Sequence, residues 1–302
     1  MKTTCETVTF AGVRDCVRLS NGEVELTVAV GFGPRVLGYA FAGKRNVFKV
    51  FDDQLLDTGG DAWKSYGGHR LWHAPEIFPR TYYPDNEPVT WVWTDGTLTL
   101  RCPTEKGNGI GKEIRIALAE RGSGVEITHV LRNEGPWPIK VAAWCLSVMA
   151  PGGVAVVPQE PYRSHPECLV PARPLVLWHF TKMNDPRFGW GERYVTLRED
   201  SGDPTKQKFG VLNKRGWAAY LFDDVAFVKK TPYVEGAEYA DMGCNQEFYT
   251  EAGFLEMESL SPYTELACGE SLSHAEKWAL SPRVGRGDEA EFDKLGDFAN
   301  EM

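Results

Sequence analysis

The sequence lacks long apolar runs, an excess of positive charge and any regular pairing of its cysteines. No run of about eighteen apolar residues occurs, so no membrane-spanning helix is expected. The net charge is −9, which argues against nucleic acid or an anionic membrane as partner, because both require a basic surface. The seven cysteines include no Cys-x-x-Cys pair, and the N-terminal residues contain no apolar signal core. These absences favour reduced thiols and a cytoplasmic location.

Several catalytic motifs are also missing. The chain has no serine nucleophile elbow, no phosphate-cradling loop and no dinucleotide-binding fingerprint. The glycine-rich segment 107–111 lacks the Lys-Ser/Thr ending of a phosphate loop and joins strand-like patterns, so we interpret it as a hairpin. No cofactor is therefore expected, and what remains is acid–base chemistry or the binding of a polar ligand.

The composition favours a sheet protein with a ligand groove. The chain has 302 residues, of which 12% are aromatic, with 31 glycines and 19 prolines. Many turns and many large flat side chains are typical of β-sheet proteins rather than helical bundles. No linker, internal repeat or low-complexity segment divides the chain, so residues 1–302 are predicted to form one domain.

Hydrophobic alternation with period two predicts strands along most of the chain. The clearest segments are 24–30, 35–41, 89–94, 97–102, 112–118, 125–133, 139–148, 208–213, 217–222, 225–230 and 273–280. Asp95-Gly96 is a strong local hairpin signal. Segments 51–88 and 151–195 are predicted to be loops, the first lying across a sheet face, and 288–300 has helical spacing.

The segment 66–76 concentrates unlike polar groups beside aromatic side chains. Its glycine pair allows the backbone to come close to a ligand. A flat apolar face surrounded by fixed donors and acceptors suits a sugar or another small polar ligand. The predicted site residues of this segment are His69, Arg70, Trp72, His73 and Glu76. The alternative is a solvent-facing turn whose Trp72 belongs to the core.

Metal binding by the same segment is the less favoured interpretation. His69 and His73 are four residues apart, a spacing that places two imidazoles on one face of a helix. However, glutamate is absent after His69, and the flanking glycines and proline argue against a helix. Glu76 would be the third ligand, but we predict no metal.

Two glutamates near the C-terminal end of the chain are the predicted proton-transfer groups. In a strand, Glu256 and Glu258 share one face while Leu255 and Met257 take the other. The acidic face is either exposed to solvent or directed into a cleft. Paired across a substrate with His69, one of these carboxylates could act as base and the imidazole as acid.

Three further residues are predicted to contact a substrate. Arg35 begins a strand directly after a Gly-Pro corner, where it could bind a hydroxyl, carboxylate or phosphate oxygen or could be a surface charge. Tyr239 and Asp241 lie in the polar and aromatic segment 234–250.

Four pieces of the sequence form a recognisable series. They are Gly33-Pro34-Arg35-Val36 with Asn46-Val47-Phe48, Gly67-Gly68 with Trp72, the segment 125–148 with its Asn133-Glu134-Gly135 turn, and Leu255-Glu256-Met257-Glu258 followed by Cys268-Gly269-Glu270-Ser271. Together they span most of the chain. In these motifs and their order, the sequence resembles the galactose mutarotase-like superfamily.

The resemblance implies an all-β fold, an antiparallel β-supersandwich with few short helices, whose concave sheet binds carbohydrate. It also implies a late-strand glutamate as base at the anomeric hydroxyl, a role for Glu256 or Glu258, and a histidine as acid at the ring oxygen. At the usual place of that histidine, this chain has Ala143-Trp144-Cys145-Leu146. Either His69 or His73 takes over the role, or the protein does not catalyse mutarotation.

Three functions therefore stay open. The first is an enzyme acting on a sugar or uronate, as an epimerase, a mutarotase-like isomerase, a lyase or a hydrolase. The second is a carbohydrate-binding protein without turnover, and the third is a β-domain whose aromatic loop contacts another protein. The first two imply a small-molecule carbohydrate as partner, and the expected assembly is a monomer or homodimer.

Overall fold

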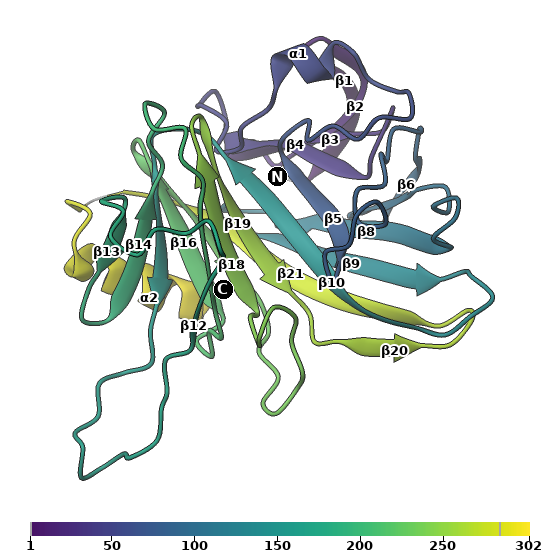
Figure 1. The fold of residues 1–302 in the computed structure, drawn as a ribbon. Helices are drawn as coiled ribbons and strands as arrows, with labels where there is room; N and C mark the ends of the chain where they lie inside the picture. The colour runs from purple at the N-terminus through teal and green to yellow at the C-terminus, as the bar shows by residue number, and fades with distance from the viewer. Residues whose placement is uncertain (1, 284) are drawn as a thin grey trace.

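The computed structural model describes residues 2–283 and 285–302, which form two antiparallel β-sheets around a shared core (Figure 1). The strand order in the first sheet is β1-β2-β3-β4-β5-β10-β19-β18-β15-β12, with β20 paired to β10. In the second sheet it is β13-β14-β11-β16-β17-β21-β9-β8-β7-β6. The all-β fold predicted from the sequence is confirmed.

The strands of the first sheet are β1 (Thr4–Phe10), β2 (Val13–Ser20), β3 (Val24–Ala29), β4 (Arg35–Phe41), β5 (His69–Ala74), β10 (Ile139–Met149), β12 (Leu175–Leu177), β15 (Gln207–Val211), β18 (Gln246–Glu251), β19 (Phe254–Leu260) and β20 (Thr264–Leu266). Those of the second sheet are β6 (Thr90–Thr94), β7 (Thr97–Arg101), β8 (Ile110–Leu118), β9 (Val125–Asn133), β11 (Val154–Pro158), β13 (Phe188–Trp190), β14 (Tyr194–Arg198), β16 (Trp217–Phe222), β17 (Val225–Lys230) and β21 (Ser271–Pro282). The helices are α1 (Asp52–Leu55) and α2 (Glu289–Glu301).

Local patterns predicted most of these strands, both half-buried ones such as β9 and fully buried ones such as β15 and β16. In β9, for example, buried residues alternate with more exposed ones along the whole strand. The Asp95-Gly96 hairpin also forms, with φ angles of 51° and 77°, as the tight turn between two twisted strands requires. No helix in the described part of the chain has the length and apolar character needed to cross a bilayer.

Two segments correct the sequence-based prediction of loops. Segment 151–195 contains β11, β12, β13 and the start of β14. Segment 51–88 is not a continuous loop either. It contains α1 and, more importantly, β5, which lies between β4 and β10 near the middle of the first sheet (Figure 1). All six residues of β5 are buried, so both of its faces are covered. A strand covered on both faces shows no alternation between apolar and polar residues, and its flanking glycines and proline favoured a turn.

Gly67 and Gly68 lead the chain into β5 through a very close backbone approach. Their φ angles are 80° and 70°, in the left-handed region. A Cβ atom on Gly67 would lie 2.1 Å from the carbonyl oxygen of Lys49, and one on Gly68 would lie 2.1 Å from that of Val36. Only glycine fits at either position, so this pair fixes where β5 begins.

Candidate functional site

The register of four neighbouring strands places a row of mostly polar side chains on the outer face of the first sheet. On β5, Arg70 lies directly across from Leu146 of β10, which in turn faces Glu258 of β19. Glu258 lies across from Glu247 of β18. Directly paired residues of antiparallel strands point to the same side, so groups from four strands meet on one surface.

A second row runs parallel to the first, one pleat repeat further along the strands. Here Glu256 of β19 lies across from Tyr249 of β18, and Tyr249 from Lys208 of β15. Successive side chains on the same face of a strand are separated by two residues, or roughly 7 Å. Glu256 and Glu258 therefore project from β19 on the same side, as the sequence predicted, with Leu255 and Met257 in the core.

These rows form the floor of a cleft with a volume of about 580 Å³. Apart from Trp178, which lies against Lys208, its aromatic lining falls into two groups. We call one the Trp72 set, which consists of Trp63, Trp72, Tyr82 and Trp144. We call the other the Phe254 set, which consists of Phe51, Phe180, Tyr249 and Phe254. A largely apolar cleft with a few fixed polar groups has the character of a small-ligand site.

Glu256 is paired with Arg70 across the cleft floor. The Nη2 atom of Arg70 donates to Oε1 of Glu256 at 3.1 Å, and the guanidinium lies 4.6 Å from the ring centre of Trp72. The pKa of Glu256 is raised, because burial disfavours its charged form and Arg70 only partly offsets this effect. Glu256 therefore retains its proton more readily than an exposed glutamate.

Lys208 lies between two carboxyl groups on the same floor. Its Nζ atom is 3.0 Å from Oε2 of Glu258 and 2.7 Å from Oε2 of Glu247. Burial lowers the pKa of Lys208, but the two carboxylates outweigh burial and raise it. The pKa of Glu247 is raised well above its ordinary value by burial. One ammonium group cannot neutralise two carboxylates, so this arrangement favours a proton on Glu247.

Glu258 is the most firmly oriented acid of the cleft. Besides the ion pair with Lys208, its Oε2 atom accepts a hydrogen bond of 2.7 Å from the indole Nε1 of Trp144. Its Oε1 atom is buried without a hydrogen-bond partner among the described residues, and so are Nε and Nη1 of Arg70. A buried polar group without a partner is costly, so these atoms are natural contacts for a polar ligand.

Five of the residues predicted from the sequence line this cleft, and five do not. The cleft brings together Arg70, Trp72, Glu76, Glu256 and Glu258. Glu76 lies at its edge, where it accepts a hydrogen bond from the hydroxyl of Tyr82. His69, His73, Arg35, Tyr239 and Asp241 lie outside the lining.

His69 lies on the opposite face of β5, between the two sheets. Its Nδ1 atom is 2.9 Å from the hydroxyl of Ser147, and its Nε2 atom is 2.7 Å from Nε2 of His129. Burial lowers its pKa well below the ordinary value. Neighbouring residues of a strand point to opposite faces, so the structure does not bring His69 to the ligand side of Glu256 or Glu258.

The group around His69 is a hydrogen-bonded network that joins the sheets. Nδ1 of His129 donates to the carbonyl oxygen of His274, so its Nε2 accepts from His69. Nearby, Glu276 of β21 forms an ion pair with Nζ of Lys229 at 2.9 Å and accepts a hydrogen bond of 2.8 Å from the indole Nε1 of Trp278. His69, His129 and Glu276 are near enough to hold a metal ion. Their polar atoms nevertheless already have protein partners, so we assign them a structural role.

The other four residues also lie away from the cleft, although both ring nitrogens of His73 are buried without a hydrogen-bond partner among the described residues. His73 lies 3.5 Å from Glu105, which is paired with Lys112, on the core side of β5. The predicted metal ligands His69, His73 and Glu76 are thus not brought together, because Glu76 lies in the cleft. Arg35 donates to the carbonyl oxygen of Ser65 at 2.6 Å, and burial lowers its pKa to about 9.

Tyr239 and Asp241 lie in the turns before β18. The hydroxyl of Tyr239 accepts from the backbone N–H of Val234 at 3.0 Å. Asp241 has a left-handed backbone, with a φ angle of 49°. Its charge contributes to the raised pKa of Glu247, so it acts on the cleft from outside the lining.

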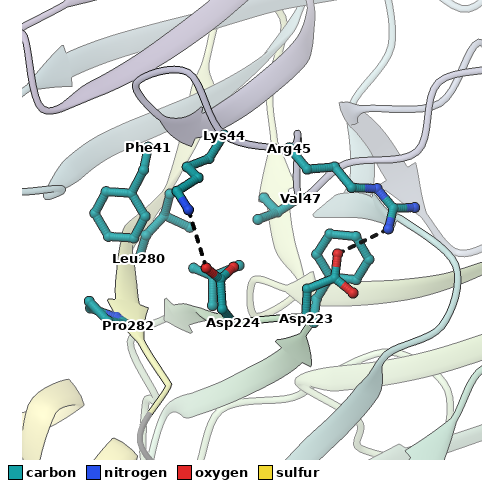
Figure 2. A pocket seen from close by; sticks show the side chains of 10 residues that line it. Phe41, Lys44, Arg45, Val47, Asp223, Asp224, Leu280 and Pro282 are labelled. Carbon is teal, nitrogen blue, oxygen red and sulfur yellow. Dashed lines mark hydrogen bonds and ion pairs between the residues drawn. The ribbon is translucent and has the colours of Figure 1, made fainter.

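Figure 2 shows a second cavity, of about 270 Å³, at an end of the sandwich. Its apolar lining includes Phe41, Val47 and Leu280. At its edge, Lys44 pairs with Asp224 at 3.4 Å and Arg45 with Asp223 at 3.0 Å. These charges are exposed and mutually neutralised, unlike the buried groups of the larger cleft. We therefore place the candidate site in the larger cleft.

Comparisons with known proteins agree with this fold. A scan against protein-family models finds no match, and a search of curated proteins finds none either. Among solved structures, a galactose mutarotase-like protein from Lactobacillus casei is 11% identical, with a TM-score of 0.57 over 88% of this chain and 100% of the other. A protein described as a putative aldose 1-epimerase from Escherichia coli gives the same identity and TM-score over 88% and 98%.

A third solved structure is similar over only part of its length. It is a TPR-domain containing protein from Parabacteroides distasonis, 12% identical, with a TM-score of 0.60. The match covers 90% of this chain but 48% of the other. At these identities the similarity concerns the fold alone. Together with the two-sheet topology, these matches show that the chain has the galactose mutarotase-like fold.

Proposed function

We propose that the cleft binds a neutral sugar and interconverts its anomers, with the two carboxyl groups of β19 as the proton-transfer pair. The observation that carries this proposal is the projection of Glu256 and Glu258 from one strand face into an aromatic-lined cleft, between Arg70 and Lys208. Aromatic faces suit the apolar side of a pyranose, and the charged groups suit its hydroxyls.

The charge balance of the lining supports a neutral sugar rather than a uronate or a sugar phosphate. The lining has three basic residues, Arg70, Lys206 and Lys208, and four acidic ones, Glu76, Glu251, Glu256 and Glu258. An anionic ligand requires an excess of positive charge, which these residues do not supply.

Anomer exchange requires one proton to leave the anomeric hydroxyl and one to reach the ring oxygen as the bond between C1 and that oxygen breaks. Rotation in the open-chain aldehyde and the reverse transfers then close the ring as the other anomer. Glu258 is the proposed base, because it is paired with the ammonium of Lys208 and is directed into the cleft. Glu256, whose pKa is raised, is suited to donate the proton. Glu256 thus takes the acid role that the sequence had assigned to His69.

The test is anomer exchange followed by polarimetry or NMR on wild type, Glu256→Gln and Glu258→Gln. We expect both substitutions to slow exchange by about 10²- to 10⁴-fold while sugar affinity changes little. With a monosaccharide as substrate, Glu251→Gln is the matched control, because Glu251 lines the cleft beside Phe254 and does not belong to the pair. Exchange at the wild-type rate in either paired variant would contradict the proposed mechanism.

Sugar binding without turnover is the second candidate function, and two observations favour it. No histidine of the described chain lines the cleft, and Glu256 and Glu258 are both already ion-paired. In that case the wild-type protein would bind sugar but exchange anomers no faster than buffer, and both substitutions would change affinity alone.

A further inference from the structure

The two aromatic groups of the cleft lie at opposite ends of the carboxyl pair. Trp144, of the Trp72 set, is paired in register with Leu260, whereas Phe254 begins the same strand β19. These two positions on β19 are six residues apart, which corresponds to roughly 20 Å of extended strand. Glu258 and Glu256 occupy the positions between them. The cleft thus runs along β19, with aromatic side chains at each end.

The two sets differ in how much of their aromatic surface is free. Trp72 and Trp144 are only 4% and 2% exposed. The guanidinium of Arg70 lies over the ring of Trp72, and the indole N–H of Trp144 is hydrogen-bonded to Glu258. In the Phe254 set, Phe180 is 42% exposed and the other three rings are partly exposed. Trp63 and Tyr82 of the Trp72 set are also partly exposed, so both ends offer some aromatic surface, but Phe180 at the Phe254 end is the most exposed ring of the cleft.

The Phe254 end lies beyond the reach of the sugar on which the carboxyl pair acts. Phe254 is two residues from Glu256 and four from Glu258, so its backbone is about 10 Å along the strand from the midpoint of the pair. A pyranose ring is about as wide as one strand spacing. A sugar with its anomeric carbon between the two carboxyls therefore leaves Phe254 and its neighbour Phe51 for the next unit, while Tyr249, across from Glu256, lies between the two units.

Polar groups accompany the free rings. Lys206 and Glu251 line this part of the cleft, with Nζ of Lys206 3.9 Å from Oε2 of Glu251. Both side chains are partly exposed, so each can turn from this long ion pair to a hydroxyl group. An aromatic face beside a donor and an acceptor meets the requirements of a sugar unit.

We infer, resting on the proposed function, that the Phe254 set is a second sugar subsite and that the substrate is a reducing disaccharide or longer saccharide. The first unit presents its anomeric carbon to Glu256 and Glu258. The second unit stacks on the exposed rings of Phe180 and its neighbours. A free monosaccharide fills only the first position.

The test is calorimetric titration of the whole chain with two matched series, glucose against maltose and cellobiose, and galactose against lactose. At least one disaccharide should bind about tenfold more tightly than its own monosaccharide, the gain expected of one good aromatic stacking contact. Phe180→Ala should abolish this gain and leave monosaccharide affinity unchanged. Trp137→Ala removes an exposed aromatic outside the cleft and should change neither affinity.

Two kinds of result would overturn the inference, and they differ from failure of the proposed function. If disaccharides bind no more tightly than monosaccharides, or if Phe180→Ala weakens both equally, the second subsite is wrong while sugar binding stands. If neither monosaccharides nor disaccharides bind to wild-type protein that is shown by thermal melting to be folded, the proposed function fails and the inference fails with it.

Discussion

Glu276 between the sheets and Glu256 in the cleft are both buried carboxyl groups beside a cation, yet their pKa values shift in opposite directions. Burial alone would raise both. At Glu276, Lys229 together with His69, His129 and His274 outweighs burial, and the pKa falls well below its usual range. At Glu256 burial prevails over Arg70, and the pKa rises. Glu276 has hydrogen-bond donors from Ser259 and Trp278 as well.

The comparison distinguishes a structural network from a ligand site. Around Glu276, donors and acceptors satisfy one another, as folding requires of a polar cluster inside a core. In the cleft, Arg70 and Glu258 retain buried atoms without partners. The same residue types thus serve two purposes, around Glu276 on β21 of the second sheet and around Glu256 on β19 of the first, and these two clusters differ in how completely their hydrogen bonds are formed.

The largest expected effect comes from removing one lysine from each region. Lys229→Met leaves the buried carboxylate of Glu276 without its cation and should lower the free energy of unfolding by about 3–5 kcal/mol. Lys208→Met should cost less, about 1–3 kcal/mol, because Glu247 already favours its protonated form and the cleft is open to water. Urea unfolding followed by circular dichroism measures both. Equal losses would remove the energetic distinction between the two regions.

A smaller effect is expected from neighbouring residues on the two faces of β5. His69→Gln should lower the free energy of unfolding by about 1–2 kcal/mol, because its hydrogen bonds are disturbed, and leave sugar affinity within about twofold. Arg70→Gln should weaken sugar binding by about tenfold or more, because it removes a charged donor from the cleft. Calorimetric titration and urea unfolding of both variants separate the two roles. Loss of anomer exchange in folded His69→Gln would restore His69 as a catalytic candidate.

The smallest effect is a difference in pH dependence. Since the pKa of Glu256 is raised on folding, the folded state binds more protons than the unfolded state above about pH 4.5, and this contribution to stability is lost as the pH rises. Glu276, whose pKa is lowered, contributes stability that is lost as the pH falls below about 4.5.

Glu256→Gln should therefore gain stability relative to wild type between pH 4.5 and 7, by an amount on the order of 1 kcal/mol. Glu276→Gln should lose stability relative to wild type over the same range. Unfolding free energies measured at several pH values give both slopes. A common sign for the two variants would show that the environments of the two carboxyl groups are alike.

The sequence predicted half-buried strands, fully buried ones such as β16, which lacks the glycine pair and proline that flank β5, and the orientation of the β19 glutamates. Leu255 and Met257 are apolar and their neighbours acidic, so local alternation alone assigns the two faces. The same reasoning fails in β5. All its residues are buried, and its face assignment depends on the pairing of Trp72 with Trp144 of β10, seventy-two residues later by their numbers.

Two cleft residues that the sequence did not predict, Lys208 and Trp178, depend on the order of strands in the sheet. Lys208 and Trp178 are far from Glu258 in sequence, and they approach it because β18 and β15 follow β19 in the sheet. The available signal was a lysine within the buried strand β15, flanked by Gln207 and Phe209. A lysine inside such a strand requires an anionic partner, but only the sheet order shows that the partners are Glu247 and Glu258.

The close approach of Gly67 and Gly68 to the backbone has a consequence for the identity of the cleft itself. Because strand side chains alternate, shifting β5 by one residue would bring His69 and His73 into the cleft and send Arg70 and Trp72 into the core. The carbonyl groups of Lys49 and Val36, which leave no room for a side chain on either glycine, oppose such a shift. Gly67 and Gly68 thus fix which face of β5 is available to a ligand.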